Sequence, residues 1–355
     1  MRESFFDGKR GIVFTGAVVG ILSVLLMQSE DFLNTGLCII CFMDDLAGTL
    51  GLYKVTAVQY FRLEIIGIVV GAFLMAFIRN EFSVRSGSSP LLRFILGFLV
   101  MVGILMFLGC PLQMILRLGS GDLNALWGLA GLVTGIIIGL FFLKKGFSLK
   151  RNYRLPKLKK ISFFFVMLGV LILLLIRPIF TYFSEQELDL LQPVIWLSLV
   201  VGIVIGLLAQ RTRLCLVGGI RNLFLCKDAS LFLGFLSIFI FAALTNLILE
   251  TYNWGFSEQP LAHQDSLWNF LGMVLVGWGS ILWGGCPLRQ LVLFGEGNID
   301  AVITFLGMLV GSVVAHYFML ASSTAGPTFN GKIAVIISLV VLFFIAYSNT
   351  EDLKI

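Results

Sequence analysis

Long uninterrupted apolar runs are the feature that most limits what this chain can fold into. A helix needs about 20 apolar residues to cross a bilayer, and ten such runs occur in the 355 residues. Because 58% of the residues are apolar, 13% are charged and the mean hydropathy is +0.99, disordered proteins, nucleic-acid binders and ordinary soluble enzymes are excluded. We expect an all-α polytopic protein of the lipid bilayer, with spans near 11–28, 61–78, 92–109, 124–143, 161–182, 191–209, 231–249, 268–285, 299–320 and 332–348.

The placement of Lys and Arg predicts how the spans are oriented, because basic loops stay in the cytoplasm. Segment 144–160 carries eight Lys or Arg, and 210–229 carries four. Residues 250–267 carry neither, so this connection is expected outside. The alternation of basic and non-basic connections predicts that both termini lie in the cytoplasm. The first span is expected to be retained rather than cleaved. The connection expected outside between 144–160 and 210–229 is acidic, through Glu185, Glu187 and Asp189.

The chain also repeats itself at a fixed offset. With a shift of 176 residues, the tetrapeptide Gly-Cys-Pro-Leu at 109–112 falls on the same tetrapeptide at 285–288. One extra span separates the copies, so the second copy is expected to be inverted. Inverted repeats place a binding site near the membrane midplane. The expected parts are a first half (1–143), a basic cytoplasmic loop with a linker span (144–190), an inverted second half (191–320), and a last span with the C-terminal tail (321–355).

Two connections are too apolar to lie in water. Residues 34–57 and 210–229 are predicted to dip back into the membrane, which non-helical backbone tolerates only inside protein or beside a polar pathway. A shift of 177 residues relates a Leu-Cys pair in one dip to a Leu-Cys pair in the other. We therefore expect an hourglass-like protein with four repeat-related cysteines on one axis, two entering from outside and two from inside: Cys38 and Cys110, and Cys215 and Cys286.

The duplicated tetrapeptide predicts an anion site in each half. Its glycine permits a sharp turn, and its proline suits the first position of a helix. The cysteine would then lie at a helix N-terminus, where free N–H groups and the helix dipole favour an anion. One such cysteine alone would be taken as a packing residue, as we expect for the unpaired Cys41 and Cys226, but duplication in register favours a function. The residues concerned are Gly109, Cys110 and Pro111, and their repeats Gly285, Cys286 and Pro287.

Charges within apolar segments are costly in lipid and are usually functional. Arg289 follows Cys286 by one helical turn, and its repeat equivalent is Gln113. We expect both side chains to support the anion site, with the positive charge on the cytoplasmic side only. The other candidate charges are Arg62 with Glu64, Arg117, Arg213 and Arg221, of which Arg213 has the alternative interpretation of a positive-inside marker. No set of metal ligands is evident.

With these motifs the chain resembles the YeeE/YedE family of sulfur transporters. The resemblance rests on the two Gly-Cys-Pro-Leu copies, the run Arg-Leu-Cys-Leu-Val-Gly-Gly-Ile-Arg-Asn at 213–222 and the segment around Cys38. Residues 38–52 and 58–67 resemble the YedE branch, which is associated with selenium metabolism. The resemblance therefore implies a transporter of a small sulfur- or selenium-containing anion, with a selenium species favoured and thiosulfate as the alternative.

The resemblance also implies where the anion passes. Thiosulfate-transporting relatives are hourglass-shaped and pass the anion along central cysteines by hydrogen bonds to their thiols. By motif match that role falls on Cys38, Cys110 and Cys286, and the repeat adds Cys215. It further implies a bacterial inner-membrane protein without a cofactor, not an enzyme. A small cytosolic sulfurtransferase-like (TusA-like) protein is a candidate partner.

Two other classes of function remain open. The pair Cys38-x-x-Cys41 fits a quinone-linked membrane thiol oxidoreductase, which predicts a cycling disulfide and a bound quinone. A scaffold that only recruits a cytosolic sulfur-handling protein would not need duplicated cysteines in apolar sequence. Trapping of mixed disulfides would distinguish the oxidoreductase from the transporter.

Overall fold

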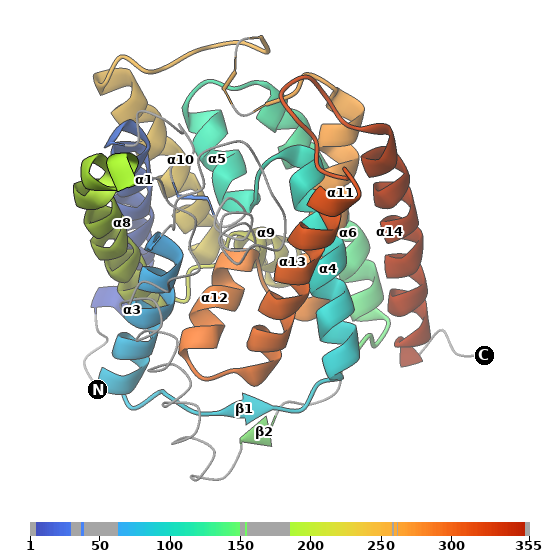
Figure 1. Ribbon diagram of the computed structural model, residues 1–355. Helices are drawn as coiled ribbons and strands as arrows, with labels where there is room; N and C mark the ends of the chain where they lie inside the picture. Colours follow the sequence, from blue (N-terminus) through green and yellow to red (C-terminus); the bar gives the residue numbers. More distant parts are fainter. Residues whose placement is uncertain are drawn as a thin grey trace.

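The chain folds into a bundle of long apolar helices that surround several short ones (Figure 1). A computed structural model describes residues 5–29, 37–38, 63–149, 153–154, 185–257, 259–260 and 262–351. Within them, eight helical stretches are long and apolar enough to cross a membrane, as an all-α polytopic membrane protein requires. The elements are η1 (Phe5–Asp7), α1 (Lys9–Ser29), α3 (Glu64–Ile78), β1 (Arg85–Ser86), α4 (Pro90–Phe107), α5 (Pro111–Gly119), α6 (Asn124–Lys144), β2 (Tyr153–Arg154), α8 (Glu185–Thr212), α9 (Leu216–Cys226), α10 (Ser230–Ile248), α11 (Ser266–Trp283), α12 (Pro287–Gly295), α13 (Ile299–Tyr317) and α14 (Phe329–Ser348).

Nine of the ten predicted spans coincide with helices, and the tenth, 161–182, lies outside the described residues. One helix begins earlier than the predicted span. Helix α8 already includes Glu185, Glu187 and Asp189, which were expected in the connection before a span at 191–209.

Segments predicted to share one side of the membrane are joined to each other. Strands β1 and β2 pair antiparallel, so the loop after α3 is linked to the basic segment after α6. A further bridge links Phe147 to Thr350 at the end of α14. The segments expected on the other side are likewise joined, by a bridge between Asp122 and Gly255. The pairing is consistent with the alternation of basic and non-basic loops.

The sequence repeat is also a repeat of helix boundaries. A shift of 176 residues carries α4 onto α11 and α5 onto α12 with identical ends, and α6 onto α13 with starts that differ by one residue and ends that differ by three. Unusual backbone repeats as well, since Leu108 and Gly284 end α4 and α11 in the left-handed conformation, with φ of +58° and +99°. Figure 1 shows α5 running toward one end of the molecule and α12 toward the other, as inversion requires.

The two sets of helices are interleaved rather than side by side. Helix α6 packs on α11 and its equivalent α13 packs on α4, while α3 packs on α8 and α10 on α1. Glycine permits the close approach at equivalent positions: a Cβ on Gly131 would overlap the carbonyl oxygen of Phe270, and a Cβ on Gly307 would overlap that of Phe94. Small residues at helix crossings are typical of membrane bundles.

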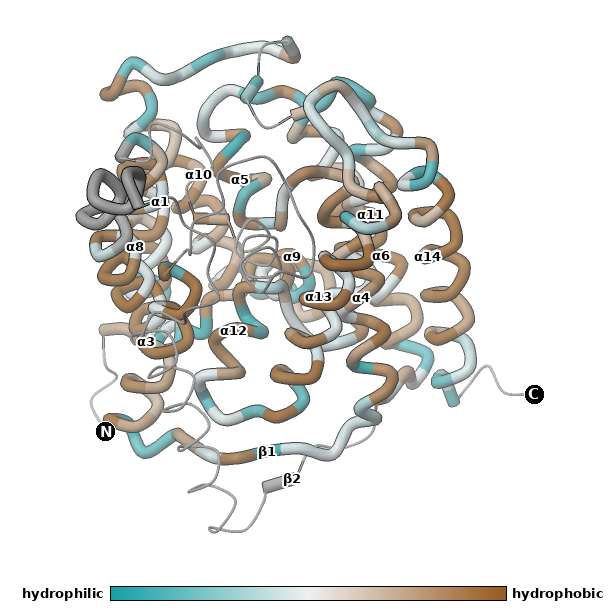
Figure 2. The backbone as a smooth tube through the Cα atoms, viewed as in Figure 1, coloured by the Kyte–Doolittle hydropathy of each residue, from teal (hydrophilic) through white to brown (hydrophobic). Residues whose placement is uncertain are grey.

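The helices differ in how they face the surroundings. Helix α11 lies at the centre, and nearly all of its side chains are buried. Helix α14 lies at the periphery, where Ile336, Ile337 and Phe344 are exposed, as residues that face lipid would be. Figure 2 shows hydrophobic residues along the long helices and most hydrophilic ones near the connections. The short helices α5 and α12 and the first half of α9 are thus enclosed by the bundle.

Candidate functional site

Three cysteines begin the three short helices. Cys110 precedes α5, Cys215 precedes α9 and Cys286 precedes α12, each with extended backbone. All three side chains are buried and belong to one continuous core that also contains Cys38. Because the first N–H groups of a helix have no partner within it, each cysteine lies where an anion or a thiolate is stabilised.

The prolines and glycines of the duplicated tetrapeptide have different tasks. Pro111 and Pro287 occupy the first helical turn, as predicted. The sharp turn, however, lies one residue before the predicted Gly109 and Gly285, at the left-handed residues that end α4 and α11. Glycine at position 285 avoids a steric clash, because a Cβ there would lie 3.0 Å from Cγ of Arg289 and 3.6 Å from Sγ of Cys215.

Cys215 and Cys286 are neighbours although 71 residues separate them. Their sulfur atoms lie 3.8 Å apart, within hydrogen-bonding distance. Two backbone amides donate to Sγ of Cys215, from Gly218 at 3.2 Å and from Cys286 at 3.4 Å. The starts of α9 and α12 therefore converge on a single sulfur atom.

Two buried amide side chains lie one turn beyond the cysteines. Gln113 follows Cys110 by three residues and Gln290 follows Cys286 by four. Each is 1% exposed, and within the described part of the chain neither its amide oxygen nor its amide nitrogen has a hydrogen-bond partner. Buried polar groups are nearly always paired in folded proteins, so both amides are available to a ligand. Gln290 was missed at the sequence level because its repeat equivalent is Met114.

The predicted charge of Arg289 has a partner. Its guanidinium forms a 3.1 Å ion pair with Glu296, and both side chains are 15% exposed. The carboxylate offsets part of the positive charge that Arg289 was expected to bring to the site. Sequence inspection did not reveal this pair, because Glu296 lies at the far end of the short helix.

The two remaining predicted charges lie in the α8–α9 turn (Arg213) and within α9 (Arg221), and neither hydrogen-bonds to a cysteine of the described residues. Arg213 is exposed, with a left-handed φ of +54°. Arg221 is half-buried and donates two hydrogen bonds to the amide oxygen of Asn222, at 3.0 and 3.1 Å. Exposure of Arg213 favours its interpretation as a positive-inside marker.

Two arginines, Arg117 buried and Arg93 half-buried, hold the turns that present Cys110 and Cys286. The guanidinium of Arg117 donates to the backbone oxygen of Phe107, the last residue of α4, at 3.0 Å. At the equivalent place in the second half, Arg93 donates to the backbone oxygen of Trp283 at 2.8 Å. The two arginines are not repeat equivalents, so the sequence offset does not reveal that both donate to the last residue of a long helix.

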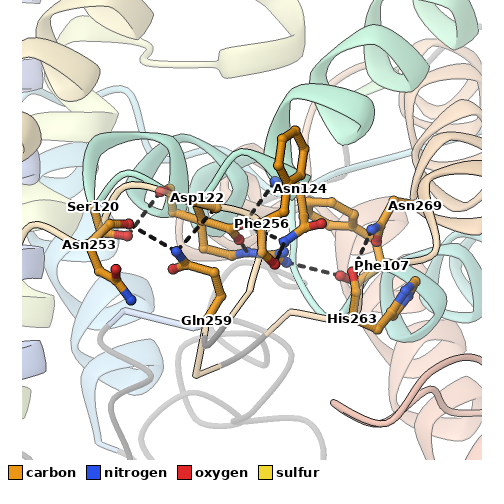
Figure 3. Close-up of polar contacts among 11 residues, drawn as sticks. Phe107, Ser120, Asp122, Asn124, Asn253, Phe256, Gln259, His263 and Asn269 are labelled. Carbon is orange, nitrogen blue, oxygen red and sulfur yellow. Dashed lines mark hydrogen bonds and ion pairs between the residues drawn. The ribbon is translucent and has the colours of Figure 1, made fainter.

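Arg117 is anchored by an acidic partner that sequence inspection also missed. Its Nε lies 2.7 Å from Oδ2 of Asp122, and both side chains are buried. The other carboxylate oxygen accepts from the backbone and side-chain nitrogens of Asn124, at 2.9 Å each. Figure 3 shows Asp122 and Asn124 among the polar contacts of this network, between the end of α5 and the start of α6. The guanidinium also lies 4.5 Å from the centre of the Phe107 ring.

The same network extends into the connection between α10 and α11 (Figure 3). Nε2 of His263 lies 2.8 Å from the carbonyl oxygen of Met106, and the Asp265 amide donates to Nδ1 at 3.3 Å. A carbonyl only accepts, so Nε2 carries the proton and the ring is neutral. Burial lowers the pKa of His263 below its usual value.

The other cysteines are arranged differently. Cys38 is buried and disulfide-bonded, so it carries no thiol in this structure. Cys41 lies outside the described residues, so its expected packing is not tested. Cys226 is exposed at the end of α9, which corrects the expectation that it packs.

Comparison with known proteins relates part of this chain to sulfur transport. The family model described as "Sulphur transport" matches residues 211–347, which include Cys215 and Cys286. The thiosulfate transporter TsuA of Spirochaeta thermophila is 31% identical over 107 residues, covering 30% of this chain and 32% of that protein. The thiosulfate transporter TsuA of Escherichia coli is 30% identical over 123 residues, covering 33% of each. The chain thus spans about a third of the length of these curated relatives.

Proposed function

We propose that this protein carries a small sulfur-containing anion across the membrane along its buried cysteines. The observation that carries the proposal is the convergence of buried thiols on the starts of short helices, with Cys215 and Cys286 in contact. The similarity of residues 211–347 to a sulfur-transport family supports it. A thiol is a weak donor with a polarizable sulfur, so it suits a soft anion better than a hard one.

The arrangement fits passage through several weak sites in succession. Helices α5 and α12 run from their cysteines toward opposite ends of the molecule, so the positive ends of both dipoles face inward. The unpaired amides of Gln113 and Gln290 can donate to an anion that leaves either cysteine. Conduction needs binding that is strong enough for entry and weak enough for release, which thiols and neutral amides provide.

We infer a thiosulfate-like substrate, because both relatives are named as thiosulfate transporters. A selenium analogue is the alternative cargo, suggested by the resemblance of residues 38–52 and 58–67 to the YedE branch. Most of those residues lie outside the described part of the chain. We also propose a bacterial inner-membrane location with cytoplasmic termini, and a TusA-like cytosolic protein that receives the cargo.

Uptake into proteoliposomes tests the proposal. Labelled thiosulfate should enter vesicles that contain the wild-type protein, and unlabelled selenosulfate should compete if selenium species share the route. Cys110→Ala and Cys286→Ala should each abolish uptake, whereas the matched control Cys226→Ala should retain it because that thiol is exposed. Equal uptake by all three variants would show that the cysteines only fill space.

The oxidoreductase remains a second candidate because Cys38 is disulfide-bonded. In that case Cys38→Ala should abolish quinone-dependent formation of disulfides in a reduced test protein, while thiosulfate uptake would be absent from the wild type. Uptake by wild type without disulfide formation would exclude this alternative.

A further inference from the structure

We propose that Cys215 and Cys286 are a redox-active dithiol, which small anionic compounds with sulfur–sulfur bonds convert to a disulfide. The proposal deepens the proposed function, because buried thiols are open to small anions only if the anion route reaches them. Cys215 is the attacking residue and Cys286 the resolving one. Polythionates, the oxidised relatives of thiosulfate, are the class of reagent.

The surroundings of Cys215 stabilise a thiolate, which is the reactive form of cysteine. Two backbone amides donate to its sulfur, from Gly218 at 3.2 Å and from Cys286 at 3.4 Å, and the Cys286 thiol, 3.8 Å away, can donate to it once Cys215 is a thiolate. The backbone amides of Arg289 and Leu216 interact with the sulfur of Cys286, whereas the close amide hydrogen bonds of this pair, at 3.4 Å or less among the described residues, are made to Cys215. The asymmetry assigns the first attack to Cys215.

The sulfur atoms also have room to join. A disulfide needs about 2.05 Å between sulfur atoms, so the pair must close by somewhat less than 2 Å from 3.8 Å. Glycines flank Sγ of Cys215 on two sides: a Cβ would lie 3.0 Å away at Gly218 and 3.6 Å away at Gly285. Side chains at either glycine would hold the sulfur in place, whereas their absence leaves it space to rotate.

The chemistry balances with tetrathionate as the oxidant. The Cys215 thiolate attacks an inner sulfur of tetrathionate, forms a Cys215–S–SO₃⁻ adduct and releases one thiosulfate. Cys286 then loses its proton and attacks Sγ of Cys215, which forms the protein disulfide and releases a second thiosulfate. Two thiols are oxidised, one sulfur–sulfur bond of tetrathionate is reduced, and two protons are released.

Peptide mass spectrometry of the full-length protein tests this directly. After incubation of the reduced, detergent-purified protein with tetrathionate, we expect a Cys215–Cys286 disulfide and two thiosulfates released per disulfide formed. Cys286→Ser should stop at the adduct on Cys215. In Cys215→Ser, adduct formation on Cys286 should be at least about tenfold slower. Cys226→Ser should form the disulfide as the wild type does.

Two results would overturn the inference: Cys215 unmodified in folded wild type, or equal adduct rates in the two serine variants. Folding of each variant is checked by gel filtration, and a variant that fails is replaced by the alanine variant. The readout also separates this inference from the proposed function. If the disulfide forms but vesicles show no uptake, only the transport proposal is contradicted. If uptake occurs without any modification of Cys215, only the proposal of a redox-active dithiol is contradicted.

Discussion

The buried ion pair between Arg117 and Asp122 allows a quantitative test, because the protein holds its own uncharged version. The residues at the same repeat positions in the second half are Leu293 and Asn298. Asn298 at the start of α13 makes the same local hydrogen bond as Asp122 before α6, since the side-chain oxygen of each accepts from the amide two residues later. The double variant Arg117→Leu/Asp122→Asn therefore copies a pair that the fold already accommodates.

The expected energies follow from what each change leaves behind. Asp122→Asn leaves a buried guanidinium without its counter-charge, which costs about 3–5 kcal/mol. Arg117→Leu leaves a carboxylate that keeps both hydrogen bonds from Asn124, so we expect about 2–3 kcal/mol. The double variant should lose only about 1–3 kcal/mol, because no charge stays buried. The coupling energy should therefore be at least about 2 kcal/mol.

Unfolding in mixed micelles of mild detergent and sodium dodecyl sulfate measures these free energies. The four proteins form a double-mutant cycle, and uptake should follow the same order because Arg117 also holds the turn before Cys110. Additive losses, or single variants as stable as the wild type, would refute the assignment of this pair as a structural support for the turn.

Two further predictions concern the second charge pair and pH. Arg289→Gln should weaken anion binding by roughly five- to thirtyfold, about 1–2 kcal/mol. Glu296→Gln should strengthen anion binding, because its carboxylate offsets the charge of Arg289. Isothermal titration measures both affinities, and a change in the same direction in the two variants would remove Arg289 from the site. Because the pKa of His263 is lowered in the folded protein, folding opposes protonation of this side chain. The stability of the protein is therefore unaffected by His263 above about pH 6.5 and falls as the pH drops below that value. Unfolding at pH 7.5 and 5.5 should reveal this loss in the wild type, and His263→Gln should reduce it.

The sequence was a good guide to the architecture because its signals are local. Runs of apolar residues mark the spans, and Pro111 and Pro287 mark helix starts, since each depends on a few consecutive residues. The offset of 176 residues then relates the short helix α5 to α12, and the boundaries of these two helices agree with the offset. Properties of one segment, or of two copies of a segment, could thus be predicted.

The contacts that shape the site were largely hidden, because they join residues with no relation in sequence. Arg93 supports the α11 end as Arg117 supports the α4 end, yet the two differ by 24 positions instead of 176. The pairing of Arg289 with Glu296 and the missing partners of Gln290 are likewise tertiary properties. The repeat predicted that Cys215 and Cys286 enter from the same side, but it did not predict that their sulfur atoms would lie within hydrogen-bonding distance.

The interleaving of the two helix sets has a consequence for synthesis and for ancestry. Among the described helices, the most extensive contacts run between α6 and α11, α3 and α8, α1 and α10, and α13 and α4, and each joins a helix before residue 150 to one after residue 184. The first set of helices is synthesised before its packing partners, so its glycine-lined faces contact lipid until the second set leaves the ribosome. A single-copy ancestor with the same faces would have needed a second molecule inserted upside down, so duplication turned an antiparallel dimer into one continuous polypeptide.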